Sequence, residues 1–266
     1  MKTPLTYYGG KQQLASLIIS LIPEHRLYCE PFVGGGAVFF KKAPSPVEVV
    51  NDINSELVNF YEVVKNDFVS LEKEIRITLH SRDQHRKATV IYNNPDMFDK
   101  VKRAWALWVM ANESYSGKLD GTFGYDRKGQ TSKTIMNKRD GFTMEYAERL
   151  QNVQIECTGA LRIIRSYDAL DSFFYLDPPY FNSDMGHYDG YTKEDFIELL
   201  ESLAQIKGKF LLSSYPSDIL NDYREKNNWT QIGKIMSLAV SHPLTGKKRQ
   251  KRELLTANYH IEEQER

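Results

Sequence analysis

Cysteine is scarce in this chain, and long apolar runs are absent. The 266 residues include two cysteines, Cys29 and Cys157, both in apolar, strand-like segments, and we interpret them as small buried hydrophobic residues. The six histidines are scattered without ligand spacing, so we expect no bound metal. No apolar stretch approaches the roughly 20 residues that cross a bilayer, and the amino-terminal residues do not resemble a signal peptide. We therefore expect a cytoplasmic protein with no membrane partner.

The formal net charge is zero, because 35 basic residues balance 35 acidic ones. That balance argues against a protein that coats a polyanion, but positive charge is concentrated locally. One basic cluster occupies residues 247–252 and comprises Lys247, Lys248, Arg249, Lys251 and Arg252. A second lies within residues 118–139 and comprises Lys118, Arg127, Lys128, Lys133, Lys138 and Arg139. Each cluster fits a nucleic-acid-binding face, and a solvated basic loop is the alternative for each.

The segment most informative about function is residues 173–180, which read Phe-Phe-Tyr-Leu-Asp-Pro-Pro-Tyr. Its apolar half predicts a strand buried on both faces, as in the centre of a parallel sheet. Two prolines then end the strand and fix the backbone, which holds Asp177 and Tyr180 at its carboxyl edge. Ligands of open α/β sheets bind at that edge.

Upstream, the pattern predicts two strand–helix units. Residues 27–32 predict a strand, followed by a turn at Gly34, Gly35 and Gly36 and a helix from about Ala37. The three contiguous glycines differ from the G-x-G-x-x-G spacing of dinucleotide-binding proteins, which disfavours a nicotinamide oxidoreductase. Residues 47–52 predict a second strand, with a helix over about 54–64. Asp52, at the end of that strand, suits either ribose hydroxyls or a helix cap.

The chain has room for one large domain or for a core that carries an insertion. Residues 67–110 predict helices whose tryptophans we assign to core packing. Residues 112–141 predict a long polar loop with basic and aromatic residues, which is more often functional than decorative. We therefore interpret 60–150 as an inserted, mainly helical subdomain, and 1–59 with 151–266 as the catalytic domain.

The strand–helix pattern returns after residue 150. Strands are predicted at 153–157, 173–176 and 210–214, and a helix at 160–167. Thr192 and Asp195 fit a capping box at the start of a helix that ends near Ala204. Residues 229–240 and 252–260 predict a hairpin with the 247–252 cluster at its tip.

Four motifs in order resemble one known family. Aromatic-Gly-Gly-Lys at 8–11, Glu-Pro-Phe-x-Gly-x-Gly at 30–36, Asn-Asp at 51–52 and Asp-Pro-Pro-Tyr at 177–180 resemble the Dam-like, class D12 DNA adenine methylases. The resemblance covers nearly the whole chain and includes residues 251–259. It implies an α/β, Rossmann-like class I methyltransferase sheet with a carboxyl-terminal antiparallel hairpin, S-adenosylmethionine as methyl donor, and a flipped adenine in duplex DNA as acceptor.

Transferred position by position, the resemblance also implies site residues. The cofactor-binding set comprises Tyr8, Lys11, Glu30, Pro31, Phe32, Gly34, Gly36, Asp52, Thr158, Gly159, Ala160 and Asp177. Relatives often carry an acid where this chain has Gly159. The catalytic set comprises Asp177, Pro178, Pro179 and Tyr180.

The chemistry of these residues suits an exocyclic amine, whose lone pair is delocalised into the base. The Asp177 carboxylate and the Pro178 carbonyl can each accept one amine hydrogen, which favours a pyramidal, nucleophilic nitrogen. Tyr180 would stack on the extruded base. This reaction needs no covalent enzyme nucleophile and no metal.

If the chain methylates DNA, each basic cluster has an expected role in DNA binding. The 247–252 cluster would lie on phosphates, and Lys118 and Arg127 are the candidates for contacts to guanine edges. The region does not contain the Phe-Asn-Val-Pro run that we associate with GATC-specific relatives, so no recognition sequence is assigned. We expect a monomer or weak dimer with no obligate protein partner.

Two alternatives stay open. The chain could methylate DNA cytosine or RNA adenine, although Asp rather than Ser before Pro178 favours adenine. It could also be a DNA-binding module whose enzymatic core has decayed, as the glycine at 159 suggests.

Overall fold

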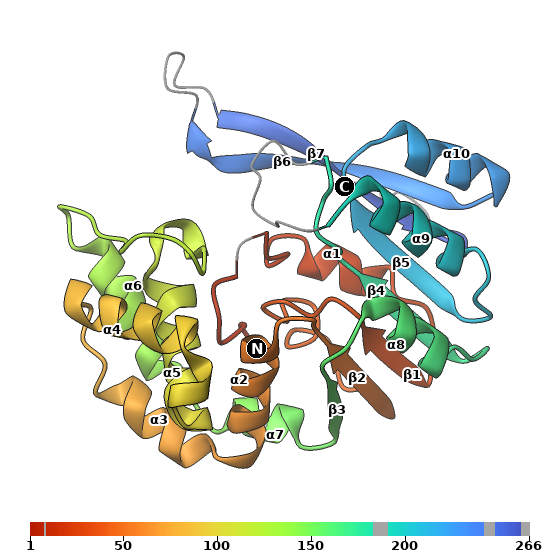
Figure 1. Ribbon diagram of the computed structural model, residues 1–266. Helices are drawn as coiled ribbons and strands as arrows, with labels where there is room; N and C mark the ends of the chain where they lie inside the picture. The colour runs from red at the N-terminus through yellow and green to blue at the C-terminus, as the bar shows by residue number, and fades with distance from the viewer. Residues whose placement is uncertain (8, 183–190, 242–247, 262–266) are drawn as a thin grey trace. The chain divides into compact units, whose positions relative to one another are not determined.

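The structure is a computed structural model that describes residues 1–7, 9–182, 191–241 and 248–261; of residues 236–241 and 248–250 only the backbone is described. The chain divides into two compact units (Figure 1). Unit 1 comprises Met1–Ser20 and Val33–Gly159, and unit 2 comprises Leu21–Phe32 and Ala160–Arg266. These boundaries differ from those of the expected insertion, because the first strand belongs with the carboxyl-terminal half.

Unit 1 is mainly helical. Its strands β2 (Val47–Asn51) and β3 (Val153–Glu156) pair in parallel. Its helices are α1 (Ala15–Ser20), α2 (Ser55–Asn66), α3 (Phe68–Arg76), α4 (Arg82–Asn93), α5 (Lys100–Glu113), α6 (Gln130–Asp140) and α7 (Glu145–Leu150), with short 3₁₀ turns at Pro95–Met97 and Tyr115–Gly117.

Helix α5 is the centre of the helical part of unit 1 and packs against α2, α3 and α4 (Figure 1). Trp105 and Trp108 are both buried in it, which confirms their assignment to the core. Polar links hold the same helices: Arg103 pairs with Glu56 of α2, and the Trp105 indole N–H donates to Thr78 Oγ1 at 2.7 Å. A helix surrounded by others is apolar on most of its surface, as α5 is over residues 104–111.

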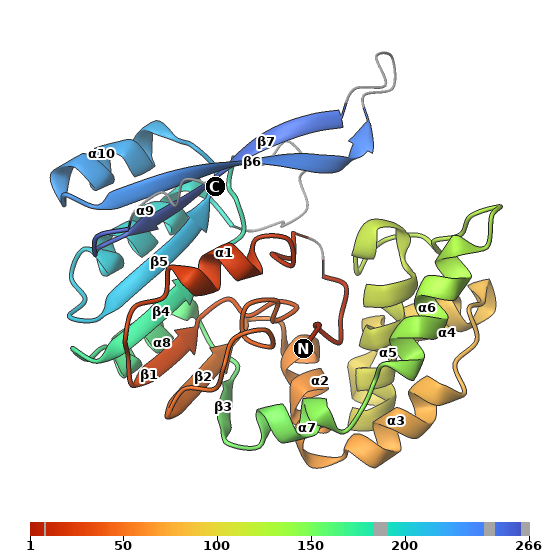
Figure 2. The same ribbon diagram turned by 180° about the vertical axis from the view of Figure 1, so that it is seen from behind.

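The described residues of unit 2 form five strands and three helices. The strands are β1 (Leu27–Glu30), β4 (Ser172–Leu176), β5 (Lys209–Ser214), β6 (Thr230–Ser241) and β7 (Lys248–Ala257), and the helices are α8 (Ala160–Tyr167), α9 (Lys193–Leu203) and α10 (Asp218–Lys226). Strands β1, β4 and β5 run parallel, and β7 is antiparallel to both β5 and β6. Figure 2 shows β6 and β7 as a long ribbon that extends beyond β5.

Strand β4 has the central place that its apolar run predicts. All five of its residues are buried, and β1 and β5 flank it in parallel, with Phe174 opposite both Cys29 and Phe210. Within unit 2 the described strands form a mixed sheet in the order β1-β4-β5-β7-β6, and in unit 1 β2 lies beside β3. The predicted α/β class is therefore confirmed, as is the Thr192–Asp195 capping box at the start of α9.

Two expectations about local structure are wrong, and one helix was missed. The helix expected from Ala37 is a series of turns in which the Val38 carbonyl accepts from both Lys41 and Lys42 N–H, because Pro44 and Pro46 follow too closely for a helix to propagate. The expected loop at 112–141 contains helix α6. Helix α10 was not expected.

The positions of two sequence features also differ from expectation. Strand β7 begins at Lys248, so Lys248, Arg249, Lys251 and Arg252 lie on a strand instead of at a hairpin tip, while Lys247 lies outside the described residues. Cys29 is buried as expected, but Cys157 is exposed because it follows the last residue of β3.

Candidate active site

The glycine-rich turn after β1 depends on two glycines in left-handed backbone conformations. Gly34 has φ 48° and Gly36 has φ 68°, a region that side chains strongly disfavour. A Cβ on Gly36 would lie 2.8 Å from the Phe40 ring. The turn is held by hydrogen bonds from Gly36 N–H to the Val33 carbonyl at 2.8 Å and from the Tyr61 hydroxyl to the Gly34 carbonyl at 2.7 Å.

Asp52 links this turn to the end of β2. Its Oδ2 accepts the Gly34 N–H and its Oδ1 accepts the Asn54 N–H, each at 3.0 Å. Burial raises the pKa of the Asp52 carboxyl, and these backbone N–H donors oppose the rise. The side-chain oxygen of Asn54 caps α2, so Asn54 and not Asp52 is the helix cap. Asp52 instead organises the turn, and contact with a ribose stays a prediction.

Asn51 is a residue whose structural role was not predicted. Its Nδ2 donates to the Thr158 carbonyl at 2.9 Å, and its Oδ1 accepts the Thr158 N–H at 3.0 Å. This reciprocal pair fixes the segment after β3 beside the end of β2. Gly159 is exposed, and a Cβ there would meet nothing within 4 Å. The surrounding structure therefore leaves room for a side chain at this position.

The Gly9–Gly10 segment forms a tight turn, with the Gly10 N–H bonded to the Tyr7 carbonyl at 3.0 Å. Lys11 is buried, and its Nζ donates to the Gly9 carbonyl at 3.2 Å. The Tyr7 side chain lies against the glycine-rich turn, since a Cβ on Gly35 would be 2.8 Å from Tyr7 Cβ. Tyr8 lies outside the described residues.

The remaining predicted cofactor residues belong to unit 2. Glu30 ends β1, is buried, and accepts the Tyr28 hydroxyl at 2.6 Å. Pro31 follows it and is buried, whereas Phe32 is half-buried, with its ring 6.4 Å from the Tyr191 ring. Ala160 is the first residue of α8.

The Asp-Pro-Pro-Tyr segment leaves the end of β4 as predicted. Asp177 and Tyr180 are half-buried and Pro178 is buried. The Tyr180 hydroxyl contacts Asp177 Oδ1 at 3.1 Å and also Glu253 Oε1. Burial, followed by the nearby Asp177 and Glu253 charges, raises the pKa of Tyr180 well above its ordinary value. The phenol is therefore protonated throughout the neutral range.

Strands β5 and β7 contribute side chains to the same place, and two of these were not predicted. Tyr215 follows β5, and its ring lies edge-on to Tyr180 with 4.3 Å between centroids. Glu253 is buried on β7. Lys251, predicted to bind DNA, has its Nζ 4.5 Å from the Tyr215 ring centroid. No local pattern marks Tyr215 or Glu253, because only strand pairing brings them next to β4.

The six basic residues predicted in the insertion divide into two sets. Arg127, Lys128 and Lys133 are exposed. The other three, Lys118, Lys138 and Arg139, are half-buried. The Lys138 ammonium donates to Asn112 Oδ1 at 3.0 Å and to Thr6 Oγ1, and the Arg139 guanidinium donates to the Thr78 carbonyl at 3.1 Å.

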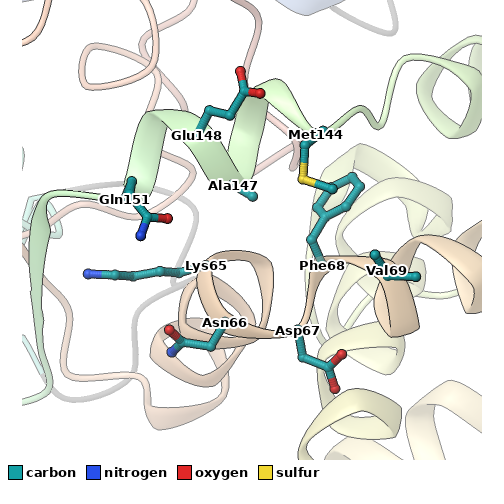
Figure 3. A pocket seen from close by; sticks show the side chains of 9 residues that line it. All are labelled: Lys65, Asn66, Asp67, Phe68, Val69, Met144, Ala147, Glu148 and Gln151. Atoms are coloured by element: carbon teal, nitrogen blue, oxygen red, sulfur yellow. The ribbon is translucent and has the colours of Figure 1, made fainter.

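A cavity of about 470 Å³ lies elsewhere in unit 1, between the α2–α3 junction and α7 (Figure 3). It contains none of the predicted site residues. Its lining is Lys65, Asn66, Asp67, Phe68, Val69, Met144, Ala147, Glu148 and Gln151. Within the described ranges, no helix is long and apolar enough to cross a membrane.

Parallel strands accompanied by helices, with a glycine-rich turn following β1 in sequence and an Asp-Pro-Pro-Tyr segment following β4, define an α/β protein. The family model for the D12 class N6 adenine-specific DNA methyltransferases matches residues 7–240. The chain belongs to this family, and it is an enzyme that methylates adenine in DNA. A methyl donor is thereby implied.

Similar proteins agree with this assignment. The type II methyltransferase M.MjaIII of Methanocaldococcus jannaschii is 31% identical over 220 residues, which are 74% of this chain and 75% of that protein. The type II methyltransferase M1.LlaDCHI of Lactococcus lactis is 28% identical over 94% of this chain and 93% of its own length. The DNA adenine methylase of Escherichia coli K12 is 27% identical over 96% of this chain and 94% of its own length.

Proposed function

We propose that the chain transfers a methyl group from S-adenosylmethionine directly to the N6 amine of an adenine flipped out of duplex DNA. The observation that carries this proposal is the Asp177–Tyr180 segment at the carboxyl end of the central parallel strand β4. Its backbone is held by Pro178 and Pro179, and its carboxylate and phenol are in contact. The proposal extends family membership to particular residues and a particular donor.

Asp177 and Pro178 would handle the amine. The Asp177 carboxylate would accept one N6 hydrogen and the Pro178 carbonyl the other. A backbone restrained by two consecutive prolines cannot easily turn that carbonyl away. Directing both hydrogens to fixed acceptors localises the nitrogen lone pair, which is an effect of positioning and electrostatics.

Tyr180 would provide the surface on which the extruded base stacks. Extruding a base costs a few kcal/mol, and stacking on an aromatic ring returns about 1–3 kcal/mol. The edge-on contact with Tyr215 and the hydroxyl contacts with Asp177 and Glu253 hold the ring in one orientation. The base would therefore meet a preformed aromatic surface.

The unit 1 residues suit the methyl donor, which supplies an electrophilic sulfonium methyl group when bound. Gly34 and Gly36 leave the turn backbone free of side chains, so a ligand can approach it closely. Asp52 is half-buried, and its carboxylate keeps acceptor capacity beyond the backbone hydrogen bonds from Gly34 and Asn54. These residues are part of the proposed binding set, whose other members are Tyr8, Lys11, Glu30, Pro31, Phe32, Thr158, Gly159, Ala160 and Asp177.

The division of labour along the chain is part of the proposal. Residues 1–59 and 151–266 would bind the cofactor and carry out the chemistry, and residues 60–150 would recognise the target. Support for the second role comes from the exposed Arg127, Lys128 and Lys133 beside the exposed aromatic Tyr125.

The Asp177→Ala variant tests the catalytic assignment. Methyl transfer to duplex DNA should fall at least about a thousandfold, because one of the two hydrogen acceptors is removed, while S-adenosylmethionine affinity stays largely intact. Transfer of tritiated methyl groups and calorimetry measure the two quantities. Asp222→Ala, at an exposed position on α10, is the matched control. An Asp177→Ala enzyme that keeps most of its activity would remove the role assigned to this carboxylate.

The substrate and cofactor assignments have their own tests. Label found only in structured RNA, or only in cytosine after digestion to nucleosides, would contradict the assignment to DNA adenine. Failure of S-adenosylmethionine to bind at millimolar concentration would favour a DNA-binding module with a decayed core.

A further inference from the structure

A short segment near the amino terminus, residues 3–7, joins two parts of unit 1 that differ in proposed function. It leads into the Gly9–Gly10 turn, and the Tyr7 carbonyl closes that turn by accepting a backbone N–H at 3.0 Å. The segment also holds the glycine-rich turn, because the Thr3 hydroxyl hydrogen-bonds the Gly35 carbonyl. Both turns carry members of the proposed donor-binding set, so the position of this segment affects the shape of that site.

The same segment is held by Asn112, the penultimate residue of α5. The Oδ1 atom of Asn112 accepts the Thr6 N–H at 3.1 Å, the Thr6 hydroxyl at 3.2 Å and the Lys138 ammonium at 3.0 Å. Its Nδ2 donates to the Trp108 carbonyl at 3.0 Å and to the Pro4 carbonyl at 3.4 Å. Because three donors surround one of the two amide atoms, that atom is the oxygen.

The amide of Asn112 is out of place for a residue that only fills the core. Asn112 is 7% exposed, and it follows a run of apolar or aromatic residues at 104–111. A buried amide costs free energy unless its donor and its acceptor are both bonded, whereas an apolar side chain would pack there without that cost. What the amide adds is a fixed backbone between Pro4 and Thr6.

A glycine in the 3₁₀ turn after α5 approaches the same segment closely. Gly117 has φ 67°, and a Cβ there would lie 3.0 Å from the Thr6 carbonyl oxygen and 3.1 Å from Thr6 Cγ2. Gly129, before α6, has φ 70°, but a Cβ there would meet nothing within 4 Å. The two glycines therefore share a backbone conformation and differ in their contact with the segment.

We propose that Asn112 is a positioning residue for the methyl donor: it anchors residues 3–7 to the helices proposed to recognise the target, and the anchored segment holds the Gly9–Gly10 and glycine-rich turns in their binding positions. The proposed target-recognition residues 60–150 thereby contribute to donor affinity before DNA binds. This inference rests on the proposed donor and its binding set, and it adds a residue that acts through them.

The Asn112→Ala variant removes the anchor. The Kd of S-adenosylmethionine should rise about tenfold or more, and kcat at saturating donor should fall less than about threefold, because the groups proposed for the chemistry are unchanged. Calorimetry without DNA measures the affinity, and steady-state methyl transfer separates the KM for the donor from kcat. A folded Asn112→Ala protein with the parent's donor affinity would overturn the proposal.

Asn59→Ala is the matched control for a purely structural effect. Asn59 is 5% exposed on α2, and its amide donates to the carbonyl of Lys100, at the other end of α5 from Asn112. Its replacement should lower thermal stability as Asn112→Ala does, but should change the donor Kd less than about twofold. Equal losses of donor affinity in the two variants would show that Asn112 acts only through stability and would overturn the proposal.

The two glycines provide a second test, which removes no hydrogen-bonding group. In Gly117→Ala the added Cβ must displace Thr6, so the donor Kd should rise about threefold to tenfold. Gly129→Ala has the same left-handed backbone and should change the donor Kd less than about twofold. If Asn112→Ala does not fold, this pair decides the outcome, and equal donor affinities in the two alanine variants would overturn the proposal.

The parent protein distinguishes this inference from the proposed function. A parent that does not bind S-adenosylmethionine at millimolar concentration would reject the proposed donor, and the inference with it. A parent that binds the donor and methylates DNA adenine, with Asn112→Ala and Gly117→Ala variants that keep its donor affinity, would reject only the role of Asn112.

Discussion

Three acids of this protein, the buried Glu48 and Glu113 and the half-buried Asp52, differ in the direction or size of their pKa shift because their neighbours differ. Burial raises the pKa of Glu48, but hydrogen bonds from Arg149 and Lys42 outweigh burial, so the net pKa of this carboxyl is lowered. For Asp52, burial raises the pKa and backbone N–H donors oppose the rise. Since no cation contributes, the net pKa of this carboxyl is raised. Glu113, at the end of α5, is 1% exposed, and in the described part of the chain neither of its oxygens has a hydrogen bond of good geometry.

Glu113 makes stability depend on pH. Burial raises its pKa from 4.5 to about 8, against a smaller opposing contribution from the Ser81 backbone N–H. An acid whose pKa is higher in the folded state binds more protons when folded, so its contribution to stability is present below about pH 4.5 and is lost as pH rises to about 8. Stability therefore falls across the neutral range.

The Glu113→Gln variant removes this titration. Its free energy of unfolding relative to the parent should increase between pH 5 and pH 8, by on the order of 2–4 kcal/mol if the whole pKa difference is expressed. Urea unfolding at several pH values measures the difference. The exposed Glu148→Gln on α7 should give a curve parallel to the parent. A Glu113→Gln curve that is also parallel to the parent would exclude a neutral buried Glu113.

At the scale of elements, the segment between α5 and α6 is an ordered loop. Its ends are joined by the Ser114–Phe123 bridge and by the Gly124 N–H bonded to the Glu113 carbonyl at 2.7 Å. Asp126 accepts backbone N–H groups of Lys128 at 2.6 Å and Thr131 at 2.5 Å, which fixes the turn into α6.

Helix α4 supports this loop from its amino-terminal end. His80, just before α4, donates from Nε2 to the Gly124 carbonyl, and its Nδ1 shares a hydrogen bond with Ser132 Oγ, each at 2.9 Å. The Arg82 guanidinium lies 4.3 Å from the Tyr125 ring centroid. The loop therefore presents Arg127 and Lys128 from a defined backbone.

Arg127 and Lys138 should respond differently to substitution, although both were predicted to bind DNA. Arg127→Ala should relax sequence discrimination at one base pair by about 1–3 kcal/mol and leave thermal stability unchanged, because the side chain is exposed. Lys138→Ala should lower thermal stability, because its ammonium donates to Asn112 and Thr6.

Competition binding with mismatched duplexes and thermal unfolding measure the two effects. Lys73→Ala, at an exposed position on α3, is the control for both. A stable Lys138→Ala protein with relaxed discrimination would mean that Lys138 contacts the base instead of the subdomain core.

At the scale of the whole molecule, the net charge is zero, so electrostatic attraction to DNA must come from local basic clusters. Combined substitution of Lys248→Ala and Arg249→Ala should weaken DNA binding about equally across sequences and reduce the slope of log K against log salt by about one to two. Binding isotherms between 50 and 200 mM salt measure the slope. A changed recognition sequence with an unchanged slope would contradict a phosphate-binding role.

Much of the fold follows from local sequence. The apolar run at 173–176 predicted the central strand, the prolines after it predicted the strand end, and the Thr192–Asp195 pair predicted a capping box, because each depends on neighbouring residues alone. The turn series at 37–42 and helices α6 and α10 were missed. The apolar pattern of 37–42 resembles a helix, and α6 is stabilised by contacts with the rest of the subdomain.

The candidate site likewise combines features that local sequence predicts with contacts that only the folded chain makes. The sequence alone determined that an Asp-Pro-Pro-Tyr segment follows the end of a buried strand and that a tight turn lies at Gly34–Gly36, because short-range motifs encode both. Only the tertiary structure decided that Asp52 accepts the Gly34 N–H, that Lys138 donates to Thr6 and Asn112, and that Glu253 meets the Tyr180 hydroxyl 73 residues away. These contacts join segments distant in the chain, and no local pattern specifies which partner a buried polar group will meet.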